Sequence, residues 1–123
     1  MKQIRTTTVT VATTGGAGAS AGSSTSIPIS GELLDIYLNF GQASATTDTT
    51  ITESTFGVIM VLTDSCTDGR YAPRMPVHTA AAGAITNGFD RYPLSDSILT
   101  FALAEANDSA TALIATIRWV TDF

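Results

Sequence analysis

The sequence predicts an all-β protein, a β-sandwich or a jelly-roll-like fold with about seven or eight short antiparallel strands. Apolar residues occur in short runs, several of which alternate with polar residues, as in half-buried strands. Gly, Asn, Asp and Ser separate these runs, and no amphipathic helix of normal length is evident. With 123 residues, the chain is predicted to form one domain over 1–123.

The first strand is expected over Ile4–Thr13, where Thr and Val alternate and β-branched residues favour a pleated surface. Residues 12–26 are rich in Gly and Ser and predict a flexible loop or an arm. Ile27–Phe40 gives the strongest strand signal, with a bulge or bend at Ser30-Gly31. Its alternation predicts one buried face, made of Leu34, Ile36, Leu38 and Phe40.

Two further strands are expected in the middle of the chain. Thr49–Glu53 is threonine-rich and is predicted to lie at a sheet edge, whereas the apolar run Phe56–Thr63 suits a central strand. Asp64–Gly69 has the composition of a turn. Arg70–His78 contains two prolines, which exclude a central strand and predict an extended edge segment.

The last third of the chain begins with two short features. Ala80–Ala84 predicts one helical turn, and Asn87-Gly88 predicts a tight turn. Ile98–Glu105 and Thr111–Thr121 are predicted to form a β-hairpin closed at Asn107-Asp108-Ser109. The residues expected on the buried faces of these two strands are Leu99, Phe101, Leu103, Leu113, Ile117 and Trp119.

Charge and composition restrict the partners. The net charge is −5 and the six basic residues are scattered, so neither nucleic acid nor an anionic membrane is expected to bind. Charged residues make up 14% of the chain, which suggests that a partner covers part of the surface. The single cysteine, Cys66, excludes an intrachain disulfide, and the start of the sequence resembles neither a signal peptide nor a membrane span.

No set of residues predicts catalysis, a metal or another cofactor, so the protein is not expected to be an enzyme. Cys66 and His78 are the one nucleophile–base pair, and a buried thiol with a loop histidine explains them more simply. Asp64 and Asp68 could suggest calcium, but an ordinary Asx turn accounts for them better. The acidic residues are better explained as solvated carboxylates than as the catalytic pair of a glycosidase. The aromatic residues are better explained by packing in the core or an interface than as the lining of a sugar-binding groove.

Two segments are candidates for an interface. In Arg70-Tyr71-Ala72-Pro73-Arg74, the proline stiffens the chain, and Arg70, Tyr71, Pro73 and Arg74 are proposed to contact a partner. The alternative is that these arginines pair with Asp64, Asp68 or Asp90 of the same chain. The second segment is the Gly/Ser tract, which is expected to lie on another chain or, alternatively, over its own sandwich; its candidate contacts are Gly15, Gly16, Gly18 and Gly22.

Three features, in order, carry a family resemblance. Ser30-Gly31 precedes a hydrophobic strand, Tyr71-Ala72-Pro73-Arg74 leads to Thr79 and a small-residue stretch, and Tyr92-Pro93-Leu94 leads into the closing strands from Ile98 to Val120. Over roughly residues 27–121 the chain resembles minor capsid, or decoration (cement), proteins of tailed bacteriophages. The inserted Ala72 and the added Pro76 depart from the form expected of that pattern.

The resemblance implies a non-enzymatic protein that is made in the host cytoplasm and sits on the outer capsid surface of the virion. It implies the major capsid protein as partner and self-association, most simply as a homotrimer. The alternatives are a head–tail connector or tail component, and a carbohydrate-binding β-sandwich.

Overall fold

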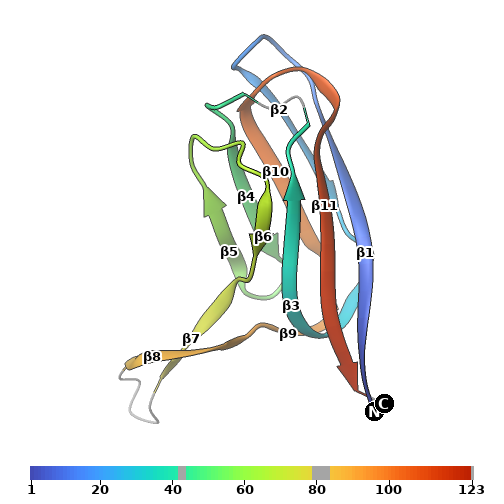
Figure 1. The fold of residues 1–123 in the computed structure, drawn as a ribbon, viewed down its shortest axis with the longest axis vertical. Coiled ribbons are helices and arrows are strands. Elements are labelled where there is room, and N and C mark those ends of the chain that lie inside the picture. Colours follow the sequence, from blue (N-terminus) through green and yellow to red (C-terminus); the bar gives the residue numbers. More distant parts are fainter. Residues whose placement is uncertain (42–43, 79–83, 123) are drawn as a thin grey trace.

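The computed structural model describes residues 1–41, 44–78 and 84–122, and within them the protein is all-β, as predicted. These residues form strands but no helix (Figure 1). The strands are β1 (Lys2–Thr13), β2 (Ser20–Thr25), β3 (Ile29–Asn39), β4 (Asp48–Glu53), β5 (Gly57–Leu62), β6 (Gly69–Tyr71), β7 (Arg74–His78), β8 (Ala84–Arg91), β9 (Pro93–Ser97), β10 (Leu99–Ala106) and β11 (Ser109–Asp122).

Two antiparallel sheets pack face to face and form the predicted sandwich. The first sheet has the order β1-β11-β3-β6, and β9 also pairs with β3. The second sheet has the order β2-β10-β4-β5. The β7–β8 pair forms a separate ribbon that projects from one end of the sandwich (Figure 1).

The core lies between the inner faces of the two sheets. In β10, Leu99, Phe101 and Leu103 are buried, and in β11 the inner side chains are Leu113, Ala115, Ile117 and Trp119. The alternation in these two strands therefore predicted the buried faces correctly. These residues pack in one cluster with Leu33, Ile36 and Leu38 of β3 and Ile51 of β4.

The predicted hairpin between the last two strands is wrong. β10 pairs with β2 and β4, whereas β11 pairs with β1 and β3, so the connection at Asn107-Asp108 crosses from one sheet to the other. Alternation identifies the face of a strand that is buried. It gives the same pattern for two strands side by side in one sheet and for two strands that face each other across a core.

The predicted positions of β4 and β5 are exchanged. The threonine-rich β4 lies between β10 and β5, and the apolar β5 ends the second sheet. Thr49, Ile51 and Glu53 of β4 face inward and are fully buried. Neighbouring strands set this position, which the hydrophobicity of a short run does not reveal.

Half of the Gly/Ser tract is a strand, so the predicted loop over residues 12–26 needs correction. β1 continues to Thr13, and β2 pairs with β10 through partners such as Ser24 and Phe101. A Cβ atom on Gly22 would lie 1.9 Å from the Ala12 carbonyl oxygen, so β1 and β2 touch where the two sheets meet. Small residues that make a chain flexible also allow two backbones to approach closely, which explains the mistaken expectation.

β3 contains two irregularities. Gly31 has a φ of +137°, and a Cβ there would lie 2.2 Å from the Val120 carbonyl oxygen, which confirms the bulge predicted at Ser30-Gly31. A second bulge follows, because Arg118 pairs with Asp35 but Trp119 pairs with Leu33. Leu33 is therefore fully buried and Leu34 is not, contrary to the predicted face.

The segments around β6–β8 differ partly from expectation. Asp64–Gly69 connects β5 to β6, as predicted, and β6 lies at the end of the first sheet. Asn87-Gly88 lies within β8 and forms no tight turn there. The helical turn predicted at Ala80–Ala84 falls outside the described residues except for Ala84, which begins β8.

Glu53 is a buried carboxylate that joins β4 to the loop before β5. It accepts hydrogen bonds from the N–H groups of Thr55 (2.8 Å) and Phe56 (2.6 Å). Burial raises the pKa of Glu53, but hydrogen bonds from the Ser97 hydroxyl and from these N–H groups outweigh it and hold the pKa below its ordinary value. The ionised form is therefore the one that the fold accommodates.

Candidate functional site

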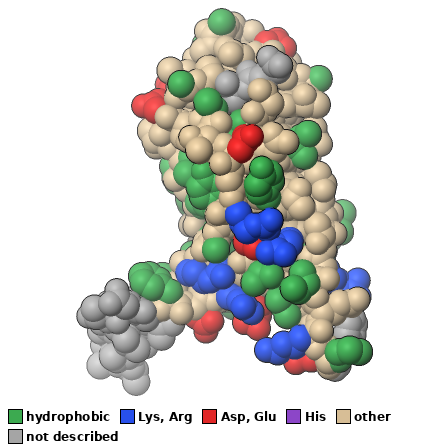
Figure 2. Space-filling model, viewed as in Figure 1, with side chains coloured by type: hydrophobic (Ala, Val, Ile, Leu, Met, Phe, Trp, Pro, Cys, Tyr) green, Lys and Arg blue, Asp and Glu red, His purple; other side chains and the backbone are tan. Residues whose placement is uncertain are grey.

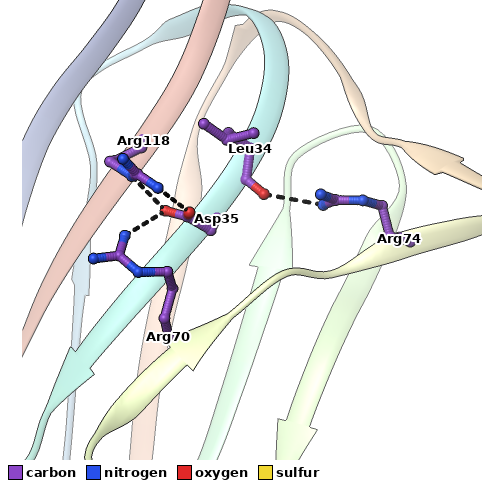
Figure 3. Close-up of polar contacts among 5 residues, drawn as sticks. All are labelled: Leu34, Asp35, Arg70, Arg74 and Arg118. Atoms are coloured by element: carbon purple, nitrogen blue, oxygen red, sulfur yellow. Dashed lines mark hydrogen bonds and ion pairs between the residues drawn. The ribbon is translucent and has the colours of Figure 1, made fainter.

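The most elaborate polar arrangement on the outer face of the first sheet surrounds Asp35. Asp35 follows the bulge residue Leu34 and belongs to the outer face of β3, where it lies opposite Arg118 of β11. On the other side of β3, Tyr37 is paired with Arg70 of β6. The sheet order thus places one carboxylate between arginines from its two neighbouring strands (Figure 3).

Both arginines bind Asp35 directly. Arg118 donates from Nε to Oδ1 (2.8 Å) and from Nη2 to Oδ2 (2.5 Å), and Arg70 donates from Nη1 to Oδ1 (3.1 Å). Asp35 is only 6% exposed, although it belongs to an outer face. The hydrogen bond from Arg118 lowers the pKa of Asp35, burial raises it, and the charges of both arginines bring it below its ordinary value.

The positions of Arg70 and Arg74 are fixed by further contacts. The guanidinium of Arg70 lies over the ring of Tyr37, 5.8 Å from its centroid, in a cation–π contact. Arg74 donates from Nη1 to the carbonyl oxygens of Leu34 (3.0 Å) and Pro73 (2.9 Å). The carbonyl that holds Arg74 therefore belongs to Leu34, the bulge residue directly before Asp35 (Figure 3).

These side chains form what we call the arginine cluster: Arg70, Arg74, Arg91 and Arg118, with Asp35 at its centre. Arg91 joins it because it is the register partner of Arg74 in the β7–β8 ribbon. Lys and Arg side chains gather on the face over β3, β6 and β7, with some acidic side chains beside them (Figure 2). Four of the five arginines of a chain with net charge −5 thus lie in one region.

The arginine cluster includes two of the residues predicted for the first interface segment. Arg70 and Arg74 belong to it, while Tyr71 donates its hydroxyl to the Thr67 carbonyl (3.1 Å) and Pro73 is buried. The intrachain partners suggested for the arginines are wrong, because Arg70 binds Asp35. Asp68 instead accepts the Phe40 N–H (2.7 Å), and Asp90 accepts the Arg91 N–H (2.8 Å).

Asp35 and Arg118 were not predicted as site residues. Alternation placed Asp35 on the outer face of its strand, and a strand over Thr111–Thr121 was expected. The missing information was the register, which puts the two residues opposite each other.

The Gly/Ser tract lies on its own chain through the turn between β10 and β11. The Gly18 N–H donates to Asn107 Oδ1 (3.2 Å), and the Gly15 N–H donates more weakly to Asp108 Oδ2 (3.4 Å). Gly16 accepts a hydrogen bond from the Ser20 hydroxyl (2.8 Å), and Gly22 lies in β2. These contacts fit the expected alternative, a loop over its own sandwich; a contact of the tract with another chain stays a prediction.

The other sequence candidates do not form a site that the structure describes. Cys66 is half-buried against the core, and the side chain of His78 is outside the described part of the chain. Carboxylate oxygens of Asp48, Asp64 and Glu105 lie within 4.8 Å of one another, and Asp48 accepts the Asp64 N–H (2.9 Å) from the segment that follows β5. Asp68, suggested for calcium, is not in this group.

The described residues enclose no pocket, and none of them forms a helix long and apolar enough to span a membrane. When the sequence is compared with protein-family models and with curated proteins, neither comparison gives a match.

Proposed function

We propose that this protein is a structural subunit of a virus particle, a capsid decoration (cement) protein that bridges major capsid proteins on the outer surface of the head. The viral assignment is based on the sequence resemblance. The observation that carries a binding role is the arginine cluster, in which the guanidinium groups of Arg70, Arg74 and Arg118 are already held in place before any partner arrives.

Pre-positioned arginines suit the binding of carboxylates on another protein. Asp35 uses one N–H of Arg70 and two of Arg118, which leaves further donors of both guanidiniums for a partner. Binding then costs less side-chain entropy, because the contacts with Asp35 and Tyr37 already restrict both side chains. Arginine and tyrosine are also common anchors of protein interfaces.

A cement role needs no catalytic group. A subunit that bridges two capsid proteins binds the assembled shell and not its separated parts, so it shifts the equilibrium toward the shell. Many weak bridges around a closed particle act together, because each bound contact raises the effective concentration of the next. A homo-oligomer such as the trimer implied by the resemblance would add to this effect.

The first experiment compares the heat stability of particles that contain or lack this protein. Genome release at a higher temperature from complete particles is the expected result, and equal release temperatures would contradict the cement role. A location in the head–tail connector or in the tail would appear directly when the protein is labelled on intact particles.

The second experiment tests the arginine cluster. Arg70→Gln keeps the Asp35–Arg118 pair and removes an exposed donor, so we expect at least about tenfold weaker binding to shells, or about 1.4 kcal/mol. Lys2→Gln is the matched control, because Lys2 is an exposed cation near the start of β1. Equal binding by both variants would exclude the cluster as the docking surface.

A further inference from the structure

The second sheet ends in an edge with unusual chemistry. Within the described part of the chain, β5 has β4 as its sheet neighbour on one side and no strand paired to the other (Figure 1). The first sheet ends on the same side in β6, which has three residues, carries Arg70 and is followed by Pro73. Short length, charge and proline are common protections against edge-to-edge pairing, and β6 has all three. The β5 edge has neither charge nor proline, and its one irregularity is a bulge at Ile59.

The side chains of β5 are apolar on both faces. Val58 and Val61 point outward and are 58% and 54% exposed, and Phe56 just before the strand is 44% exposed. Ile59, Met60 and Leu62 pack partly against the core. From Thr55 to Thr63 the sequence contains no charged residue and no proline.

The backbone geometry of this edge specifies what fits it. Unpaired N–H and C=O groups along a strand are satisfied by another extended strand, whose main chain gives the hydrogen bonds. The exposed valines require apolar neighbours on the added strand. Two chains of charge −5 repel each other, so a contact between copies is most favourable where both surfaces lack charge, as over Thr55–Thr63.

The β5 strand of a second copy meets these requirements. An antiparallel two-fold arrangement centred between Ile59 and Met60 places Val58 of one copy opposite Val61 of the other. The bulge at Ile59 brings both valines to the outer face, since Val58 pairs with Thr52 and Val61 with Thr50 of β4. Ile59 then lies opposite Met60 of the second copy, so the strand is complementary to itself.

We propose that two copies of this protein associate through their β5 edges and join their second sheets into one continuous sheet. A contact limited to one short strand lies at or below the roughly 1,200 Å² of total buried area that marks stable interfaces, so the association is weak and depends on concentration. The contact is two-fold and therefore distinct from a three-fold contact of a trimer. It does not depend on the proposed viral function.

Sedimentation of the purified full chain over a hundredfold range of concentration tests the proposal. The wild type is expected to approach twice the mass of Val61→Lys, and the variant to associate at least tenfold more weakly, because the edge lysine cannot be buried in the joined sheet. Thr100→Lys is the matched control. It adds the same charge to the same outer face, on β10, which is paired on both sides, and should associate like the wild type.

Three results would overturn the proposal: a wild-type mass that does not change with concentration, equal association of Val61→Lys and wild type, or equal weakening by Thr100→Lys. A wild-type trimer that Val61→Lys abolishes would exclude the two-fold geometry. If Val61→Lys does not fold, amide hydrogen exchange of the wild type replaces it. Exchange in Gly57–Leu62 should slow as concentration rises, and exchange independent of concentration would again refute the contact. Heat release from particles remains a separate test of the cement role.

Discussion

Replacing Asp35 with asparagine removes the central charge of the arginine cluster without changing the size of the side chain. Asp35 accepts three hydrogen bonds, two from Arg118 and one from Arg70. Asparagine has only one acceptor oxygen, so at least one of the two bonds from Arg118 is lost. The NH₂ group of asparagine then faces a guanidinium, which is also a donor. The Arg118 contact is partly buried and bidentate, and such charged hydrogen bonds contribute about 1.5–3 kcal/mol. Arg70 is 52% exposed, so its ion pair with Asp35 adds less than about 1 kcal/mol to the stability of the fold.

We therefore expect Asp35→Asn to lower the free energy of unfolding by about 2–3 kcal/mol and the melting temperature by roughly 10 °C. Trp119 is the single tryptophan, is 6% exposed and adjoins Arg118, so its fluorescence reports unfolding in urea. Asp96→Asn is the control, because Asp96 is exposed and its carboxylate has no hydrogen bond among the described residues. If the free energies of unfolding of Asp35→Asn and this control differ by less than about 0.5 kcal/mol, the ion pair does not stabilise the fold.

Two more predictions follow from groups inside the sandwich. Gly31→Ala should lower the free energy of unfolding by about 3 kcal/mol or more, because φ is +137° and the new Cβ would meet the Val120 carbonyl at 2.2 Å. The control Gly16→Ala has open space around it and should change the free energy of unfolding by less than about 0.5 kcal/mol. Similar urea midpoints for the two variants would contradict the close approach at Gly31. The pKa values of Asp35 and Glu53 lie below their ordinary 3.8 and 4.5, so the unfolded chain binds more protons in acid. The stability that the ionised Asp35 and Glu53 add to the fold is fully present above about pH 5 and is lost as the pH falls through the lowered pKa values. Glu53→Gln should flatten the acid limb of a urea–pH series, and an unchanged limb would show that Glu53 is not involved.

The inner faces of the strands could be predicted from the sequence because burial on one side of a strand produces a local alternation of apolar and polar residues. Phe101 and Ile117 stand in alternating patterns, and both are fully buried. The bulge at Leu34 interrupts such a pattern, so that Leu33 and not Leu34 packs in the core. Alternation alone does not show which residue of the strand is the extra one. The Ser30-Gly31 bulge was predictable because glycine marks it.

The arrangement of the strands was not predictable in the same way. Which strand lies beside which depends on residues far apart in the sequence, so local patterns wrongly predict β10 and β11 as neighbours and β5 as a central strand. The arginine cluster depends on the same distant pairing. Asp35 and Arg118 are 83 residues apart, and the register of β3 with β11 alone brings them together. Arg70 and Arg74 are predictable because they flank a tyrosine and a proline within one short segment.

The position of β11 has a consequence for how the chain folds during synthesis. β11 is made after the ten other strands that the structure describes, yet it lies between β1 and β3 and joins them into one sheet (Figure 1). Until the ribosome has released residues beyond Ser109, β1 lacks its main partner and the inner faces of β3 and β10 are incompletely covered. Pairing between segments so distant in sequence forms slowly, and exposed apolar strands promote aggregation meanwhile. We therefore expect nascent chains that end before β11 to be held by chaperones, and folding to follow synthesis of this strand.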